Sequence, residues 1–503
     1  DVEIWGAQFE RYGTDVWAPL RDSEMPINVF EGRPFPAHLD AMEQVAGRIE
    51  ADAVWVSKPR LPSYALGLLA KQHRNRPVVL DVDDRELSFF AEDAGLDSRG
   101  VLARRGQPDV VWPFERTWTR ACDQVIVEAD AVTVSNPTLQ HLYGGTIVPH
   151  ARDEKVFDPA LYDRAETRAR LGFGDEHRLL LFGGTPRAHK GVLDVLRALD
   201  RLGDERYRLL VFGPRALDEM RTQIGDLARW VAPLPDQPFS DLARTVHAAD
   251  LACVLQDPTH PVTAHQLPAK ITDALAMSVP CLVTPTAPLA PLLERGVLQV
   301  WDPGDDLHER IARIFDDPDE ARTRSARGRK LFLEHLSYEA LAEVVAPIFE
   351  GLLDDPPALT PRAEELIDLT HRMARATLPG AAAESTATAA TLAGAGAPAV
   401  GGGEGRSPST APGRPAERRP GDAQRRLEPG APFDLVVFWK QNDTGIYGRR
   451  QDMLLEHLAR SGRVGTIVHF DNPVTPEVLI RTWRSAGDRT HQGRLVVKQT
   501  IAR

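Results

Sequence analysis

The chain has 503 residues, of which 42% are hydrophobic and 26% charged, proportions typical of globular proteins with two to four domains. The net charge of -12 argues against a general nucleic-acid binder, and the three cysteines are too few and too scattered for a disulfide framework or a zinc site. The sequence contains no apolar run long enough to span a bilayer and does not open with a signal peptide, so we expect a cytoplasmic protein. Because the sequence does not begin with Met, we also expect a fragment.

Short apolar segments alternate with helical patterns from residue 1 to about 355. Segments rich in Val, Ile and Thr predict strands at 51–58, 76–84, 129–136 and 145–150. Helical patterns lie between them at 62–75 and 136–143. The alternation restarts further on, with predicted strands at 177–186, 207–214, 250–256 and 280–285. The helical patterns between them lie at 191–203, 217–230 and 271–278. Strands that alternate with helices predict parallel βαβ units, so we expect an α/β protein with two Rossmann-like, doubly wound parallel-sheet domains.

Changes in composition divide the rest of the chain. An amphipathic helix at 337–353 closes the second domain, and a segment dominated by Ala, Gly and Pro follows further on, where no apolar pattern could offset chain entropy. The predicted units are an N-terminal domain at 1–165, a second domain at 166–355, a helical extension at 356–380, a disordered linker at 381–432, and the truncated start of a further Rossmann-like domain at 433–503.

The stretch LLLFGGTPRAHKG ends a buried strand in two glycines and a basic loop. Gly183 and Gly184 would let a ligand approach the backbone, and Arg187 and Lys190 would lie beside a helix N-terminus, where doubly wound folds bind anions. The alternative is a solvated basic loop. The P-loop pattern and the dinucleotide pattern GxGxxG are both absent, which disfavours a nicotinamide- or flavin-dependent oxidoreductase.

The stretch HQLPAKITDALAMSVPCLV places a lysine and an aspartate at the expected entry of a helix. Asp273 near the helix start would be favourable against the helix dipole on structural grounds alone. Its functional alternative is to accept hydrogen bonds from ligand hydroxyls, as carboxylates do with ribose diols. Lys270 is undecided between contact with a diphosphate and exposure to solvent.

Acidic residues follow the strand at 76–84, and basic ones follow the neighbouring strand. Acidic loops are commonly helix caps or solvated turns, and two carboxylates at a strand end also suit a divalent cation. Asp83 and Asp84 are candidate functional residues. Lys58 and Arg60 are best explained as a solvated loop, with contact to a ligand such as a phosphate as the alternative.

GGTPRAHKG and DALAMSVPCLV together resemble the donor half of a GT-B glycosyltransferase, most similar to family 4, the group 1 glycosyl transferases. That family has a basic pair that holds the diphosphate of a nucleotide sugar, followed by an E-x7-E motif. Asp273 takes the place of the second glutamate, which implies ribose binding. His265 takes the place of the first, which usually contacts the donor sugar. The resemblance covers residues 1 to about 355 and includes the hinge-like loop VPHARDEKVFDP.

The resemblance implies transfer of a sugar from a nucleotide diphosphate sugar to a glycan or lipid-linked acceptor, with retention of configuration, in a polysaccharide pathway. It implies no metal and no organic cofactor, since the nucleotide sugar is a co-substrate, and a lipid-linked acceptor would place the enzyme near a membrane. The implied catalytic residues are Asp83, Asp84 and His265, with Asp83 and Asp84 as our candidates for orienting the acceptor. The implied donor-binding residues are Gly183, Gly184, Arg187, Lys190, Gln266, Leu267, Lys270 and Asp273, with Gln266 and Leu267 offering backbone N–H groups.

Two other functions fit the same residues. His265 supports a GT-B module that binds a nucleotide or glycan without transferring sugar. A nucleotide-sugar epimerase of the same architecture needs a pair of carboxylates, which Asp83 and Asp84 could supply. Residues 433–503 also allow two interpretations: a second glycosyltransferase after the linker, which we favour, or a permuted piece that supplies the strand and helix missing from the start of the first domain.

Overall fold

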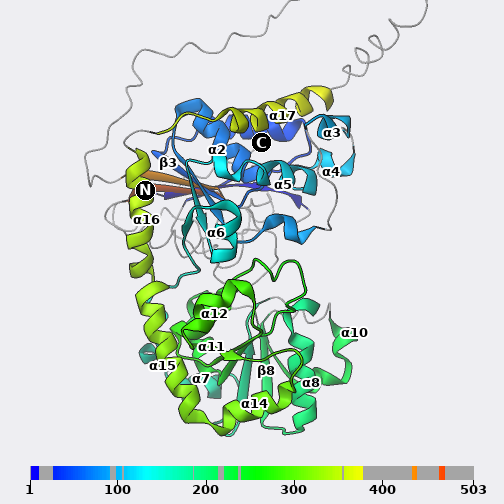
Figure 1. Ribbon diagram of the computed structural model, residues 1–503, viewed down its shortest axis with the longest axis vertical. Helices are drawn as coiled ribbons and strands as arrows, with labels where there is room; N and C mark the ends of the chain where they lie inside the picture. The colour runs from blue at the N-terminus through cyan, green and yellow to red at the C-terminus, as the bar shows by residue number, and fades with distance from the viewer. Residues whose placement is uncertain are drawn as a thin grey trace, which may run out of the picture.

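The computed structural model describes residues 2–10, 26–90, 98–104, 107–184, 186–212, 220–235, 239–353, 356–377, 433–438 and 464–470. Two α/β domains lie one above the other along the long axis, with the N-terminal domain at the top of Figure 1. Their strands pair in parallel throughout. This confirms the predicted α/β fold with two doubly wound parallel-sheet domains.

The second domain is built on a sheet with the strand order β12-β11-β10-β7-β8-β9. Its strands are β7 (Arg178–Phe182), β8 (Tyr207–Phe212), β9 (Val231–Leu234), β10 (Leu251–Val254), β11 (Cys281–Val283) and β12 (Gln299–Val300). Its helices are α7 (Arg164–Arg170), α8 (Val192–Leu202), α10 (Arg221–Ile224), α11 (Phe239–Ala248), α12 (Ala269–Ala276), α13 (Ala290–Glu294), α14 (Leu307–Asp316) and α15 (Pro318–His335). The chain runs outward from β7 to β9 and returns on the other side of β7 to form β10. This reversal of direction between β7 and β10 favours a ligand site at their carboxyl ends.

The first domain contains the parallel order β3-β4-β5-β6, with β1 paired to β2 beside it. Its strands are β1 (Val2–Gln8), β2 (Ile27–Glu31), β3 (Ala53–Ser57), β4 (Val78–Val82), β5 (Ala131–Val134) and β6 (Thr146–Ile147). Its helices are α1 (Ala37–Ala46), α2 (Leu61–Arg74), α3 (Ser98–Ala103), α4 (Pro108–Val111), α5 (Arg116–Asp123) and α6 (Pro137–Tyr143). Every residue of β3 and β4 is buried, as expected for parallel strands covered on both faces.

The helix predicted to close the second domain is α16 (Tyr338–Leu353), which runs from the second domain back to the first along one side of the molecule (Figure 1). Its buried residues join the first-domain core, where the rings of Phe349 and Trp55 lie 5.5 Å apart. The next helix, α17 (Pro361–Thr377), packs against α2 and adds Leu366 and Ile367 to the same core. The chain therefore crosses twice between the domains.

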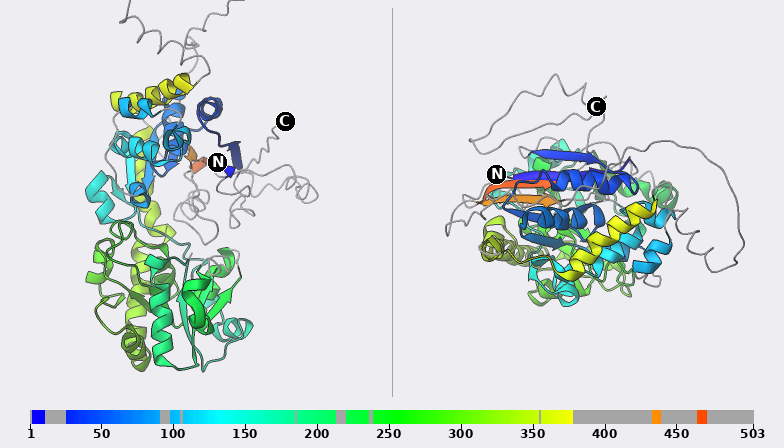
Figure 2. Two further views of the ribbon diagram at one scale, coloured as in Figure 1. Left: turned by 90° about the vertical axis from the view of Figure 1, so that its right-hand side faces the viewer. Right: turned by 90° about the horizontal axis from the view of Figure 1, so that it is seen from above.

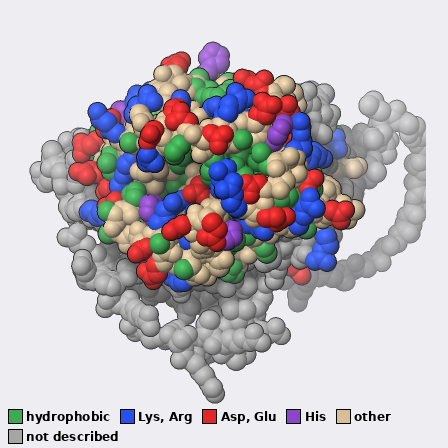
Figure 3. All heavy atoms as spheres, turned by 90° about the horizontal axis from the view of Figure 1, so that it is seen from below, with side chains coloured by type: hydrophobic (Ala, Val, Ile, Leu, Met, Phe, Trp, Pro, Cys, Tyr) green, Lys and Arg blue, Asp and Glu red, His purple; other side chains and the backbone are tan. Residues whose placement is uncertain are grey.

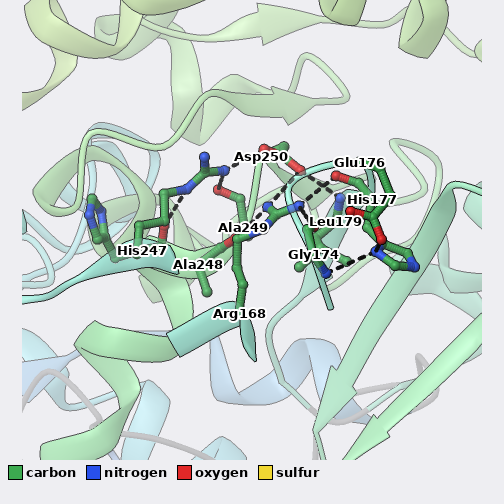
Figure 4. A network of polar contacts seen from close by, with 10 residues as sticks. Arg168, Gly174, Glu176, His177, Leu179, His247, Ala248, Ala249 and Asp250 are labelled. Carbon is green, nitrogen blue, oxygen red and sulfur yellow. Dashed lines mark hydrogen bonds and ion pairs between the residues drawn. The ribbon is translucent and has the colours of Figure 1, made fainter. Parts of the chain in front are cut away.

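Helix α7 is fastened to the second domain by a buried arginine (Figure 4). Arg168 donates hydrogen bonds to the carboxylate of Asp250, 3.1 Å away, and to the carbonyl of Ala248. Asp250 also accepts from the backbone N–H of Leu179 at 2.7 Å, so the same carboxylate ties α7 to the start of β7. Our boundary between residues 165 and 166 stays a prediction, and α7, which spans it, packs with the second domain.

Some local predictions fail. The continuous helix predicted at 217–230 is wrong within the described residues, because α10 ends at Ile224 and Gly225 has a φ of 50°. A short 3-10 segment, Gly225–Trp230, then leads into β9. Our sequence patterns did not include the short elements β2, α1 and α13.

Two strands from the end of the chain, β13 (Phe433–Phe438) and β14 (Val464–Phe470), pair in parallel with each other and with β1. Figure 2 shows them, in orange and red, beside the blue strands of the first domain. This placement is the one that a permuted piece completing the first domain would require. The second-module interpretation stays a prediction, and the linker predicted at 381–432 lies outside the described residues.

Acidic and basic side chains are interspersed over the described surface of the second domain seen from below (Figure 3). Among the helices that the structure describes, none has the length and apolar character needed to cross a membrane.

Candidate functional site

A cavity of about 140 Å³ lies at the carboxyl ends of β7 and β10, where the sheet of the second domain reverses direction. Apolar side chains of the sheet and of α11 form most of its wall, and an arginine, a lysine and an aspartate supply charge. The lining residues are Arg152, Leu181, Gly183, Gly184, Phe212, Leu242, Val246, Ala252, Cys253, Val254, Ala269, Lys270 and Asp273. The cavity therefore joins the two motifs that the sequence singled out.

The two glycines at the end of β7 face Lys270 on α12. Gly184 has a φ of 107°, a conformation that L side chains rarely adopt, and a Cβ built there would lie 3.5 Å from the Lys270 Nζ. Backbone and ammonium thus approach each other in the wall of the cavity. A bound anion could contact both the ammonium and the backbone of the glycines.

Lys270 is held in an environment that disfavours its charge. Its ammonium lies 4.5 Å from the centroid of the Phe182 ring, and no described residue forms a hydrogen bond or ion pair with it. Burial, together with the nearby ammonium of Lys190, lowers the pKa of Lys270 to about 7. A negatively charged ligand would reverse this destabilisation, so the site favours an anion.

Asp273 lies in the second turn of α12, because the helix begins at Ala269. Our structural account, in which Asp273 near the helix start interacts with the dipole, is therefore wrong. The buried carboxylate instead accepts a hydrogen bond from the Nε of Arg152. Burial raises the pKa of Asp273, while the positive charge of Arg152 acts in the opposite direction. The arginine comes from the loop after β6, so this contact links the two domains.

Lys58 and Arg60, which we expected in a solvated loop, are buried, and that prediction is wrong. The Lys58 Nζ lies 2.8 Å from the Glu86 carboxylate, and Arg60 forms a second ion pair with Glu86. Lys58 also has a φ of 69°, unusual for a residue with a side chain. Strained backbone together with buried charge is common at functional sites.

Asp83, Asp84 and Glu86 form an acidic cluster around this lysine at the end of β4. Their carboxylate oxygens lie within 4.8 Å of one another, a spacing that could hold a metal ion. The Lys58 ammonium lies 3.0 Å from Asp83 and 3.7 Å from Asp84, so it supplies positive charge to the cluster.

The carboxylates of this cluster have different proton affinities. Burial, together with the Asp83 carboxylate, raises the pKa of Asp84 to about 6. Burial alone would raise the pKa of Glu86, but Arg60 and Lys58 outweigh it and hold that pKa at about 2. The cluster thus keeps Glu86 ionised at neutral pH. It brings the pKa of Asp84 closer to neutral pH, so Asp84 can exchange a proton.

Residues of the two domains meet beside the acidic cluster. The Gln266 side chain donates to Asp84 at 3.1 Å, and the Asn136 side chain donates to the carbonyl of His265 at 3.0 Å. The Nε2 of His265 lies 3.4 Å from Arg85. Burial, and then the charge of Arg85, lowers the pKa of His265. The residue in place of the first motif glutamate therefore faces a cation of the first domain.

The structure separates the predicted site residues into groups. Gly183, Gly184, Lys270 and Asp273 line the cavity. Gln266 instead contacts Asp84, and His265 contacts Arg85, both in the first domain. Arg187 is exposed and Lys190 half-buried on the loop after β7, outside the cavity lining. The side chain of Leu267 packs in the second-domain core. The roles assigned to all of these residues stay predictions.

Sequence patterns predicted no role for Arg152, although the structure places it against Asp273 and in the cavity wall. Its one signal was its position in the hinge-like loop PHARD, between an expected strand and the second domain. The contact itself spans 121 residues of sequence, beyond what local patterns reveal.

Residues 176–317 match the family model described as glycosyl transferases group 1. Two curated relatives are D-inositol 3-phosphate glycosyltransferases. The protein of Mycobacterium marinum (strain ATCC BAA-535 / M) is 28% identical over 171 residues, which cover 32% of this chain and 34% of the relative. That of Mycobacterium ulcerans (strain Agy99) is 31% identical over 143 residues, which cover 26% and 30%. The matched region spans about a third of the length of these relatives.

The fold is similar to that of HepE from Anabaena, solved in complex with UDP and glucose. The TM-score is 0.50, with 16% sequence identity, and the match covers 66% of this chain and 88% of HepE. An identity this low supports a common fold only. The family match places a group 1 glycosyl transferase domain at 176–317, around the cavity, and the likeness to HepE shows the GT-B fold.

Proposed function

We propose that this protein transfers a sugar from a nucleotide diphosphate sugar to a glycan or lipid-linked acceptor, with retention of anomeric configuration. The carrying observation is Lys270, a half-buried cation that has no hydrogen-bond or ion-pair partner among the described residues and lies beside Gly183 and Gly184 in the cavity. Such an arrangement suits the diphosphate of a donor. The family match over the same residues and the nucleotide bound to HepE support this assignment.

The second domain would hold the donor. Gly183 and Gly184 would let the diphosphate approach the backbone, and Lys270 would stabilise the negative charge that develops as the diphosphate departs. Lys190 and Arg187 on the adjacent loop would add positive potential. Asp273 would accept hydrogen bonds from the hydroxyls of the nucleoside.

The first domain would hold the acceptor. Asp84, whose pKa is raised to about 6, would orient the acceptor hydroxyl together with Asp83. The hydroxyl oxygen would bond the anomeric carbon while the bond from that carbon to the diphosphate breaks, and its proton would leave to a departing phosphate oxygen. Contacts of Gln266 and His265 across the cleft would help to exclude water during this step. Retention rests on the family resemblance.

The test is the release of nucleoside diphosphate from UDP-, GDP-, ADP- and dTDP-sugars in the presence of glycan and lipid-linked acceptors. A transferase releases diphosphate and makes a glycoside, whose configuration NMR reports. Thermal stabilisation by a donor without release would instead indicate a binding module, which His265 motivates. Appearance of an epimerised nucleotide sugar without glycoside would indicate an epimerase. Either result would overturn the proposed transfer.

A further inference from the structure

The backbone of Arg152 lies where the two chain crossings between the domains meet. Its N–H donates to the carbonyl of Leu336 at 3.1 Å, and its carbonyl accepts from the N–H of Tyr338 at 3.0 Å. Arg152 and Ser337 thereby form an isolated parallel bridge. The loop that leaves the first domain is thus fastened to the residue that precedes α16, the helix that returns to it.

The side chain of Arg152 extends from this point into the donor cavity and is fully buried, with 0% exposure. Its Nε donates to the Asp273 carboxylate, its Nη1 donates to the carbonyl of Ala151 at 2.7 Å, and its guanidinium lies 5.6 Å from the centroid of the Phe157 ring. Contacts on several sides fix the guanidinium, so it can hold the carboxylate in one orientation.

The contact also governs the protonation of Asp273. Burial raises the pKa of this carboxyl, and Arg152 is the largest influence in the opposite direction. Without the arginine, Asp273 would take up a proton at a higher pH. A protonated carboxyl accepts hydrogen bonds from ligand hydroxyls less well than a carboxylate does.

We propose that Arg152 is a positioning residue for the donor: from the meeting point of the two crossings, it holds the Asp273 carboxylate toward the cavity for the nucleoside hydroxyls. This inference rests on the proposed function, because it assigns Asp273 to the donor. Arg152 acts through Asp273 and need not touch the donor itself.

The test measures the affinity of the intact protein for UDP, GDP, ADP and dTDP by calorimetry between pH 4.5 and 8. R152Q should weaken binding of the preferred nucleotide and move the acid limb of its pH profile to higher pH, since the carboxyl loses the opposite charge that favours its ionised form. R152K should show a smaller shift in the same direction, because it keeps the charge but loses the guanidinium geometry. R152K also allows the shift of the acid limb to be measured if R152Q does not fold.

D273N and the double variant R152Q/D273N separate positioning from general stability. D273N should remove this acid limb, and the double variant should bind no more weakly than D273N alone. The matched control is R168Q, which breaks another buried arginine–aspartate contact, that of Arg168 with Asp250. R168Q should lower the melting temperature without moving the acid limb.

An unshifted acid limb in both R152Q and R152K would overturn the inference. So would a double variant in which the losses of nucleotide-binding free energy from R152Q and D273N simply add. If the wild-type protein binds none of the four nucleotides, the proposed function fails first, and that result is distinct from nucleotide binding that is indifferent to Arg152.

Discussion

The side-chain amide of Gln266, in the second domain, donates a hydrogen bond to the carboxylate of Asp84 in the first domain, 3.1 Å away. This contact lowers the pKa of Asp84, which burial and Asp83 raise to about 6. The approach of the two domains and the protonation of a candidate acceptor-orienting group are therefore linked through one hydrogen bond.

Activity should depend on the ionisation of Asp84. Since its pKa is raised, Asp84 takes up a proton as the pH falls through about 6, and wild-type kcat/KM should fall over that range. Q266A removes a hydrogen bond to the ionised form, so the midpoint should move to higher pH. D84N should lower kcat by about 100-fold or more and abolish this limb.

The control for this prediction is Q299A, since Gln299 donates to Glu320 elsewhere in the second domain. The pH profile of Q299A should match that of the wild type. An unchanged midpoint in Q266A would separate Asp84 from the acid limb of the profile.

The ion pairs of Glu86 should dominate the stability of the first-domain cleft. E86Q removes the described ion-pair partner of the buried Arg60 and leaves Lys58 with only Asp83 and Asp84. We expect the free energy of unfolding in urea to fall by about 3–5 kcal/mol. D319N removes the exposed ion pair with Arg322 and should cost less than about 1 kcal/mol. Equal, small losses of unfolding free energy in E86Q and D319N would refute the dominant contribution of Glu86 to stability.

The same ion pairs predict the direction of an acid dependence. The pKa of Glu86 is lowered from 4.5 to about 2 in the folded protein. Its contribution to stability is therefore fully present above pH 4.5 and is lost as the pH falls toward 2. Urea unfolding of the wild type and E86Q should converge over that range, whereas a constant difference down to pH 2 would contradict the prediction.

Gly184 should tolerate no side chain. At its φ of 107°, alanine would be strained by about 1–3 kcal/mol, so G184A should lower the melting temperature and weaken donor binding. G351A is the matched control, because Gly351 lies in α16 and a Cβ there would meet no atom within 4 Å. G351A should be neutral or stabilising by up to about 1 kcal/mol. Similar behaviour of the two variants would argue against a backbone requirement at Gly184.

Patterns along the chain predicted β7, β10 and β11 because buried parallel strands are nearly continuous apolar runs. They also located the glycine pair at the cavity, since glycines at a strand end leave a local signature. Burial of Lys58 escaped prediction because its partner Glu86 lies 28 residues away and is brought close by the pairing of β3 with β4. The Arg152–Asp273 contact depends on the arrangement of two domains, which local periodicity does not encode.

Binding of the donor diphosphate by Lys270 is tested by the dissociation constant of the preferred nucleoside diphosphate, measured for K270M and the wild type. Loss of a charge-assisted contact of about 1.5–3 kcal/mol predicts a 10- to 100-fold weaker constant for K270M. Wild-type affinity should fall as the pH rises above about 7, where the ammonium loses its proton. K330M, which alters an exposed lysine, should bind like the wild type. A K270M protein that binds as tightly as the wild type, with the same pH dependence, would show that Lys270 does not hold the diphosphate.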